Sequence, residues 1–478
     1  MTHQIVPRRR FLRDAALAMA VPAFSLDSLA QTTVRRRLEW QSFKTTAQYG
    51  SLLTGIRRMK ANTNKADPNS WSYWTNIHLN TCPHSIPYFL AWHRGYLYYF
   101  ERQLRAASGD SSLVLPYWDY YSYATLPAEF TNASSTNPLY VPRMNTNVRQ
   151  ALTLAPFSNT VTNFQRGLSN AFEPTLEDAP HNPVHDIIGN VMATMESPTD
   201  PIFWLHHANV DRLWTAWVKA GGGRRMPLTT STYWSGSFSY SSTLSMQRKL
   251  TYDTRTNLFY DYQSELMPTR IPLAQLSDGR IYRVQANPER RPNAVPPLGP
   301  FRPSGRKPTG DATFSLGGAL TIGLDQRSVS AALPIEADDW SAVQEIRRGN
   351  HGSVRGSARK YKSVQLVLDN IELSEEGKKG GYYYHVYLNT PASNGATDAQ
   401  NSVLLGTLGP FQISGAMHHG GVAKLRYRVA RGALGNGAMR VGLATISFVR
   451  IDGDISPRGA TAGIGEARLE LSTEEDES

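Results

Sequence analysis

The stretch Asp200-Pro-Ile-Phe-Trp-Leu-His-His-Ala-Asn-Val-Asp-Arg-Leu-Trp214 combines a helical pattern with reactive side chains. Apolar residues recur three and four positions apart over 201–220, and the pattern stops at three consecutive glycines, Gly221 to Gly223. Residues 88–107 show the same period and stop at Ser108-Gly109. The sequence therefore predicts two long amphipathic helices, each of which carries histidine.

Histidine is concentrated around these two helices. Seven of the twelve histidines fall in two regions: His78, His84 and His93 in the first, and His181, His185, His206 and His207 in the second. His181 and His185 are four residues apart, so on a helix their rings share one face, and His207 can meet them from across a bundle. His206 is expected to face away from His207, because neighbouring side chains on a helix point about 100° apart. His93 lies early in the first helix, with His78 and His84 expected in the loop before it. The pattern predicts two clusters of three imidazoles.

Six neutral imidazoles limit the choice of metal. Calcium, magnesium and manganese prefer oxygen ligands, and a non-haem iron triad needs a carboxylate beside two histidines. Three-histidine zinc sites exist in hydrolytic enzymes, but they do not account for a second cluster in the same bundle. Ordinary core or surface histidines would explain any one of these residues but not the set, because six unpaired imidazoles in an aromatic core are costly. We therefore expect two copper ions facing each other, a pair that can reduce dioxygen.

The chain divides into regions of different period. Residues 34–262 alternate helical stretches with long polar loops, and residues 288–308 hold seven prolines, which is typical of an extended linker. Beyond it, β-branched and aromatic runs at 363–368, 382–388, 425–429 and 441–449 alternate with turn residues, as in an antiparallel sandwich. We predict an α+β fold: a mainly α-helical copper domain built around a four-helix bundle (31–262), a Pro-rich linker (263–310), a β-sandwich C-terminal domain (311–455) and an acidic tail (456–478).

The first thirty residues are typical of an export signal. Arg8-Arg9-Arg10-Phe11-Leu12 precedes an apolar run, 15–24, that is too short to span a bilayer, and its twin arginines resemble the bacterial Tat signal. The alternative is a disordered basic tail. Export through the Tat pathway predicts a periplasmic or secreted protein without a membrane anchor.

The net charge and the cysteine content limit which binding partners and which covalent cross-links are expected. The formal net charge is +11, but no helix is rich in Lys and Arg, so the excess indicates a diffuse basic surface rather than a nucleic-acid site. Cys82 is the single cysteine, which excludes a disulfide within the chain. The expected partners are small molecules, and homo-oligomerisation is left open.

Two segments resemble the paired copper-binding signatures of the tyrosinase / polyphenol oxidase family of type 3 copper proteins. They are Trp92-His93-Arg94-x-Tyr96-Leu97-x-x-Phe100-Glu101 and the 200–214 stretch quoted above. Tyr260-Asp261-Tyr262 is similar to the Tyr-x-Tyr that closes the family's copper domain, and the β domain resembles the C-terminal domain of plant-type polyphenol oxidases. The resemblance implies that His78, His84 and His93 hold one copper ion and that His181, His185 and His207 hold the other.

The resemblance also implies roles for residues beside the copper pair. Cys82 would form a thioether bond to His84, the alternative being a free buried thiol. Glu173, together with Asn182, would hold a water molecule that takes the proton of a phenol. The presence of both residues favours true monophenolase activity.

Two more positions are implied at the substrate pocket. Phe203 would lie over a ligand ring or a substrate ring, or contribute only to core packing. Asp186 would lie at the pocket mouth, where its charge attracts phenols that carry an amine and repels free carboxylates. The alternative for Asp186 is a solvated helix acid.

The implied activity is oxidation of phenols by dioxygen. Monophenols would be hydroxylated to o-diphenols, and o-diphenols would be oxidised to o-quinones. The alternatives are a catechol or o-aminophenol oxidase without monophenolase activity, and a haemocyanin-like dioxygen-binding protein. The C-terminal domain is expected to be either a lid that keeps the enzyme latent or a module that forms oligomers.

Overall fold

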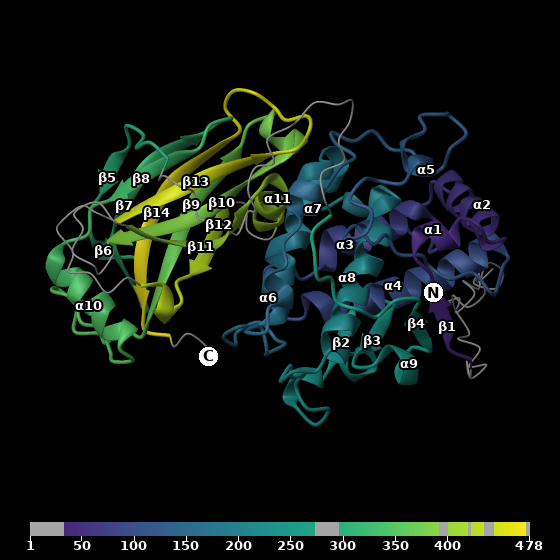
Figure 1. Ribbon diagram of the computed structural model, residues 1–478, viewed down its shortest axis with the longest axis horizontal. Coiled ribbons are helices and arrows are strands. Elements are labelled where there is room, and N and C mark those ends of the chain that lie inside the picture. The colour runs from purple at the N-terminus through teal and green to yellow at the C-terminus, as the bar shows by residue number, and fades with distance from the viewer. Residues whose placement is uncertain (1–32, 273–295, 392–399, 419–421, 435–443, 475–478) are drawn as a thin grey trace, which may run out of the picture.

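The computed structural model describes residues 33–272, 296–391, 400–418, 422–434 and 444–474. Figure 1 shows a helical half beside a half made of β-sheets, and helix α11 of the second half contacts α7 of the first. The predicted α+β class is therefore confirmed. The predicted signal and the centre of the predicted linker lie outside the described residues. Within the described ranges, every helix is too short or too polar to cross a membrane.

Four helices surround the centre of the helical half. They are α3 (Trp71–Thr81), α4 (Phe89–Ser108), α7 (Asn182–Ile188) and α8 (Ile202–Lys219). Helix α2 (Gln48–Ala61) packs against α4. Shorter helices are α1 (Trp40–Phe43), α5 (Ala128–Thr131), α6 (Phe172–Leu176), α9 (Thr254–Asn257) and the turn η3 (Glu177–His181), and β2 (Ser237–Ser239) pairs with β3 (Ser245–Gln247). The two long helices predicted from the sequence are confirmed to within one residue at each end.

The ends of α4 follow from local backbone chemistry. Tyr88, before the first helical residue, has φ of +78°, and the chain turns sharply into the helix there. Gly109 ends the helix at φ of +79°, and its N–H donates to the Arg105 carbonyl. Glycine adopts this left-handed conformation without steric cost, which makes it the usual residue after a helix.

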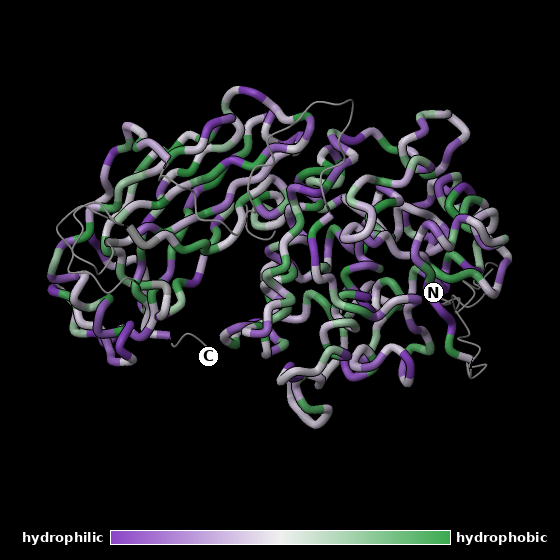
Figure 2. The backbone as a smooth tube through the Cα atoms, in the orientation of Figure 1, coloured by the Kyte–Doolittle hydropathy of each residue, from purple (hydrophilic) through white to green (hydrophobic). Residues whose placement is uncertain are grey.

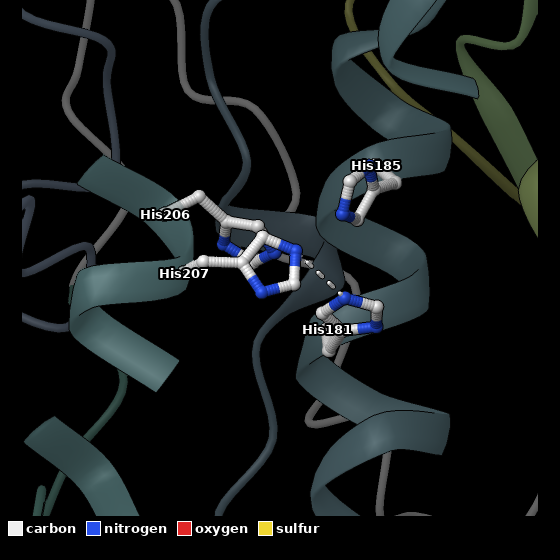
Figure 3. Close-up of side chains that lie close together, drawn as sticks. All are labelled: His181, His185, His206 and His207. Atoms are coloured by element: carbon white, nitrogen blue, oxygen red, sulfur yellow. Dashed lines mark hydrogen bonds between the residues drawn. The ribbon is translucent and has the colours of Figure 1, made fainter. Parts of the chain in front are cut away.

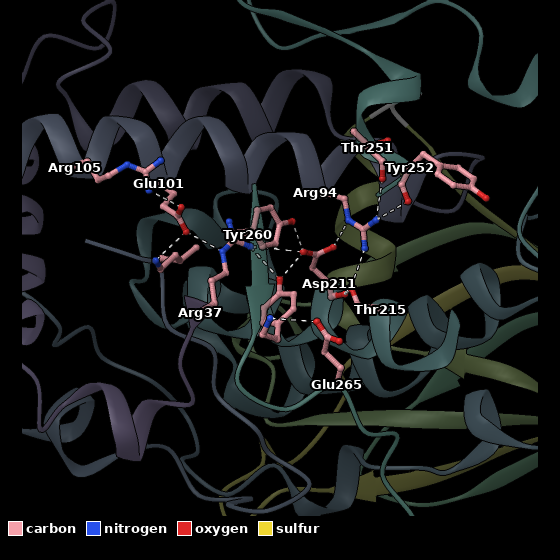
Figure 4. A network of polar contacts seen from close by, with 12 residues as sticks. Arg37, Arg94, Glu101, Arg105, Asp211, Thr215, Thr251, Tyr252, Tyr260 and Glu265 are labelled. Carbon is pink, nitrogen blue, oxygen red and sulfur yellow. Dashed lines mark hydrogen bonds and ion pairs between the residues drawn. The ribbon is translucent and has the colours of Figure 1, made fainter. Parts of the chain in front are cut away.

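A buried network of charges closes the helical half (Figure 4). Strand β1 (Arg35–Arg37) runs parallel to β4 (Tyr260–Tyr262). Arg37 Nε donates to Glu101 Oε2 of α4 at 2.8 Å, and Arg37 Nη1 lies 3.6 Å from Asp211 Oδ2 of α8. Asp211 also accepts hydrogen bonds from Arg94, Tyr260 and Tyr262. The Tyr-x-Tyr segment thus connects the two long helices.

The C-terminal half is a sandwich of two sheets around one hydrophobic core. The four-stranded sheet has the order β11-β10-β13-β8, made of β8 (Val329–Leu333), β10 (Tyr382–Pro391), β11 (Gln400–Leu408) and β13 (Ala444–Asp452). The other has the order β12-β9-β14-β7-β5 with β6 beside β7, made of β5 (Arg302–Ser304), β6 (Lys307–Pro308), β7 (Thr313–Leu324), β9 (Ser363–Leu373), β12 (Ala423–Arg428) and β14 (Ala462–Ser472). Hydrophobic and hydrophilic residues alternate along these strands (Figure 2), as expected where one face is buried. Helices α10 (Ala337–Arg347) and α11 (Pro410–His418) complete this half.

Two predicted boundaries of this half are wrong. The acidic tail was expected from residue 456, but β14 pairs with both β7 and β9 in the six-stranded sheet. Its acidic residues are compatible with a strand because Arg468 pairs with Glu466 and Glu470 on the same strand. The linker was expected to reach residue 310, but β5 and β6 already pair with β7, and their prolines are tolerated at a sheet edge.

Candidate dimetal centre

The first histidine cluster combines a helix, a loop and a second helix. His78 lies on α3 rather than in the predicted loop, His84 lies in the loop after α3, and His93 lies on α4. Their ring centroids are 5.2, 5.4 and 5.6 Å apart, and all three side chains are buried. The short helix α3 was missed because its apolar period is weak, but the cluster itself forms as predicted.

The second cluster lies between α7 and α8. His181 ends η3, His185 lies one turn later on α7, and His207 reaches them from α8 (Figure 3). Ring centroids are 4.7 to 5.6 Å apart, and Nε2 of His181 lies 3.3 Å from Nε2 of His207. Two nitrogen ligands of one tetrahedral metal ion lie roughly this far apart.

The two clusters face each other across the bundle. The His93 and His207 rings stack with centroids 4.3 Å apart, and those of His84 and His181 lie 5.7 Å apart at 23°. All six imidazoles therefore share one buried space between α3, α4, α7 and α8. Two separable groups of potential ligands result, one of His78, Cys82 and His84 and one of His181, His185, His206 and His207.

Backbone carbonyls select which ring nitrogen faces this space. Nδ1 lies 2.8 Å from a carbonyl oxygen in each of His78 (to Met195), His93 (to Phe89) and His185 (to Met192). A carbonyl only accepts, so each Nδ1 carries the hydrogen and each Nε2 keeps its lone pair. Nε2 of these three histidines is buried and makes no hydrogen bond to the described residues. This arrangement is typical of metal-binding imidazoles.

Five of the six rings are neutral at ordinary pH. Burial lowers the pKa of His78 to about 4 and that of His181 to about 3. Burial also places the pKa values of His93, His185 and His207 well below the usual histidine value. A neutral imidazole is the form that binds a metal ion, so the donor set fits two ions, one per cluster.

Asn182 acts on a ligand of the second cluster. Its Oδ1 lies 2.9 Å from His181 Nδ1, so the amide oxygen accepts the ring hydrogen. Asn182 therefore orients this ligand in the way that carbonyls orient the others.

Glu173 lies on α6, against the first turn of α4. It is fully buried on α6, where Oε1 accepts from the Leu90 N–H at 3.3 Å and Oε2 from the Arg166 N–H at 3.1 Å. Burial raises its pKa to about 7. A carboxyl group with this pKa exchanges protons readily near neutral pH.

A second buried carboxylate, Glu177, was missed by the sequence analysis. Its Oε1 accepts from the Ser85 N–H at 2.6 Å, next to ligand His84, and its Oε2 pairs with the Arg166 guanidinium. Burial raises its pKa. The available signal was the spacing, because Glu177 lies four residues before His181 and therefore about one helical turn away.

The single cysteine lies against a ligand of the first cluster. Cys82 Sγ is 3.1 Å from Nδ1 of His84, and the thiol is buried. Burial raises the pKa of this thiol well above its usual value. The side chain is thus in contact with the ring to which a thioether was predicted.

Two side chains of α8 lie among the ligands. The Phe203 ring is 4.2 Å from the His207 ring and 5.1 Å from the His78 ring, so it supports ligand rings of both clusters from within the core. His206 was predicted to face away from His207, which is wrong. Its ring lies 5.1 Å from that of His207, and both side chains extend toward α7 (Figure 3).

A phenylalanine of the β domain covers the second cluster. Phe411, on α11, stacks on the His185 ring with centroids 3.9 Å apart and planes at 15°. Its ring also lies 5.1 Å from His84 and 5.6 Å from His181, so it contacts both clusters. No spacing in the sequence connects residue 411 with the histidines, which are more than two hundred positions earlier.

Asp186 holds the segment that carries this phenylalanine. It was predicted at an open pocket mouth, but it is 0% exposed. Its Oδ1 accepts from the Phe411 N–H at 2.8 Å, its carbonyl accepts from the Gly381 N–H, and burial raises its pKa well above the usual value. The prediction of an exposed acid fails because α11 occupies the position expected for solvent.

Other contacts hold the two halves together at the same face. Asp178 Oδ1 accepts from the N–H and the hydroxyl of Thr407, at 2.9 and 3.0 Å. The Asn145 amide bonds to the Ile455 backbone in both directions, at 2.8 and 2.6 Å. The β domain is therefore docked on the metal centre by direct hydrogen bonds on either side of Phe411.

Comparison with known proteins gives one consistent result. Residues 53–158 and 131–220 match the family described as the common central domain of tyrosinase. A tyrosinase of a Hahella species is 34% identical over 191 residues, which is 32% of this chain and 40% of that protein. Chloroplastic polyphenol oxidase B of Solanum lycopersicum is 25% identical over 431 residues, which is 76% of this chain and 68% of that protein.

One solved structure has a similar fold over nearly the whole chain. Latent apple tyrosinase aligns with a TM-score of 0.50 at 18% identity, covering 92% of this chain and 97% of that one. In contrast, the bacterial matches are partial, since this chain spans 40% of the Hahella tyrosinase and 65% of one from Streptomyces glaucescens.

Proposed function

We propose that this chain is a copper enzyme of the tyrosinase and polyphenol oxidase family, and that it uses dioxygen to hydroxylate monophenols to o-diphenols and to oxidise o-diphenols to o-quinones. The observation that carries the proposal is the pair of facing three-histidine clusters. His78, His84 and His93 hold one copper ion, and His181, His185 and His207 hold the other. A copper pair held by these residues would supply electrons to dioxygen and a binding position for the phenolate.

The experiment that tests this function is oxygen uptake by the copper-loaded protein. Uptake with both tyramine and dopamine is expected for a tyrosinase. Uptake with dopamine alone would make the protein a catechol oxidase. Reversible oxygen binding without turnover would favour a dioxygen carrier instead.

We assign proton transfer from the phenol to Glu173, which is buried on α6. We expect Glu173→Gln to lower monophenolase kcat/KM by about 10² to 10⁴, the usual contribution of general acid–base catalysis, and to leave most diphenolase activity. Since the pKa of Glu173 is about 7, wild-type monophenolase activity should rise as pH increases through 7, when the carboxylate forms. The Glu173→Gln variant should lose that rise, which a pH profile of kcat/KM measures.

Glu177→Gln is the matched comparison. The new side-chain amide oxygen would still accept the Ser85 N–H, but the variant would lose the charge that pairs with Arg166. A larger monophenolase loss in this variant than in Glu173→Gln would transfer the role of base to Glu177.

The docked β domain is proposed to keep the enzyme latent. Phe411 lies against ligand rings of both clusters, in the position a phenol ring needs in order to reach the metal pair. Substrate therefore enters only when the Phe411 ring leaves this position. Oligomer formation through the β domain is the alternative role, and Phe411 would then have no effect on activity.

Displacement of α11 also uncovers Asp186. The open enzyme should turn over tyramine with a higher kcat/KM than a phenol carrying only a carboxylate, because the Asp186 carboxylate attracts an ammonium group. Asp186→Asn, assayed after proteolytic removal of the β domain, should reduce the preference about five- to tenfold. An unchanged ratio of the two kcat/KM values would remove Asp186 from substrate selection.

A thioether is proposed between Cys82 and His84. Its formation would join Sγ to a ring carbon of His84 and remove one hydrogen from each, with dioxygen as the two-electron oxidant, which is reduced to hydrogen peroxide. Intact mass should then be lower by two hydrogens after copper loading in air, and unchanged in Cys82→Ser. Equal masses of apo and loaded protein would leave Cys82 as a free thiol.

Cellular location is proposed from the leader alone. The Tat-type signal at residues 1–30 directs the folded protein to the periplasm or the exterior. Replacement of Arg8, Arg9 and Arg10 by Lys should retain the protein in the cytoplasm, which cell fractionation would reveal.

A further inference from the structure

His206 lies inside the second cluster with neither ring nitrogen satisfied. Its side chain is 0% exposed, and both Nδ1 and Nε2 lack a hydrogen-bond partner within the described part of the chain. Buried polar groups normally find partners, because desolvation without a new bond is unfavourable. A histidine buried in this way therefore requires an explanation in terms of what it binds.

The surroundings of the ring are other imidazoles. Its centroid lies 4.9 Å from that of His185, 5.1 Å from His207 and 5.3 Å from His181. One ligand atom from each of these four residues falls within 4.8 Å of the ligand atoms of the other three. His206 is thus as close to each ligand of the second cluster as those ligands are to one another.

The orientation of the side chain supports the same conclusion. His206 and His207 both extend from α8 toward α7, and the His206 ring is nearly parallel to the His181 ring, at 21° (Figure 3). On the other side, the nearest aromatic partner is Tyr120, with centroids 5.8 Å apart. A metal ion between the helices would be within reach of His206 through a small side-chain rotation.

We propose that the second metal position has four histidine donors, and that His206 binds the copper ion when one of the other three is displaced or lost. The inference rests on the proposed copper-pair function. His206 then secures the ion during ligand exchange, while three histidines hold it at rest. The rival explanation is a buried water shared by His206 and Tyr120, which would not affect metal retention.

Copper content of ligand variants tests the proposal. His207→Ala, His93→Ala and the double variant His206→Gln/His207→Ala are loaded with excess Cu²⁺, desalted and measured by mass spectrometry. We expect about one copper per chain for His93→Ala, close to two for His207→Ala, and about one for the double variant. A copper content of His207→Ala equal to that of His93→Ala would overturn the proposal.

X-ray absorption of copper-loaded His207→Ala gives an answer that does not depend on folding of the double variant. With His206 as a ligand, the average copper has three imidazole nitrogens, and without it the average falls to two and a half. The latter result would contradict the proposal. Failure of the wild type to bind two copper ions would instead contradict the proposed function, so the two failures are distinguishable.

Discussion

Replacement of Phe411 by alanine is expected to activate the enzyme without proteolysis. The Phe411 ring stacks on His185 and contacts His84 and His181, so its removal empties the space over the ligand rings. The backbone N–H of residue 411 still donates to Asp186, so the domain remains docked. We expect kcat/KM for dopamine to increase at least tenfold, about 1.4 kcal/mol in the barrier, as measured by initial rates of quinone formation.

Ile413→Ala is the matched control for this experiment. Ile413 lies on the same helix but packs into the core of the sandwich rather than on the histidines. Its truncation should destabilise the β domain by about 2–5 kcal/mol. Equal activation in both variants would mean that general loosening of the domain, rather than the Phe411 ring, controls the activity.

The grouping of the histidines could be predicted from the sequence because local spacing determines their geometry. His181 and His185 share a helical face through the four-residue interval, and His207 lies on the strongest periodic helix in the chain. The sequence could not predict that Nε2, rather than Nδ1, of His78 and His185 faces the space between the clusters. This orientation depends on the carbonyls of Met192 and Met195 in the turns before α8, which accept from Nδ1.

That α11 of the β domain covers the histidine clusters could not be predicted from the sequence, for a different reason. Asp186 was expected in solvent, but its environment is set by Phe411, more than two hundred residues later, and such contacts leave no local pattern. The predicted orientation of His206 was wrong for a geometric reason. Adjacent side chains on a helix point about 100° apart, but both can still reach the same buried space when that space is wide. Tertiary contacts, rather than helical geometry, decide these positions.

The Tyr-x-Tyr segment shows how a recognised motif acquires a physical role. Tyr260 and Tyr262 donate to one carboxylate, Asp211, which also pairs with Arg94 and Arg37 (Figure 4). Arg94 directly follows ligand His93, and Asp211 lies one turn after ligand His207. One charge therefore fixes the relative position of α4 and α8, the two helices that carry histidines of different clusters.

Asp211→Asn should consequently be the most destabilising single change in the helical half. The substitution keeps the shape but leaves Arg94 and Arg37, both buried, without this counter-charge. Breaking a buried ion pair by removing one partner costs about 3–5 kcal/mol. Urea unfolding of the apo-protein, followed by tryptophan fluorescence, should show this loss, and copper retention should decrease with it.

Two further variants distinguish the contribution of the Asp211 charge from that of the hydrogen bonds in this network. Tyr262→Phe removes the hydrogen bond to Asp211 and the one that the hydroxyl accepts from Arg37 Nη1, and should cost at least about 1.5–3 kcal/mol, the range for one bond to a charged group. Glu375→Gln, in an exposed pair with Lys378, should have no measurable effect. If Asp211→Asn proved no more destabilising than Tyr262→Phe, the hydrogen bonds and not the buried charge would hold α4 and α8 together. Retention of both copper ions by a strongly destabilised Asp211→Asn would show that the clusters position themselves without the network.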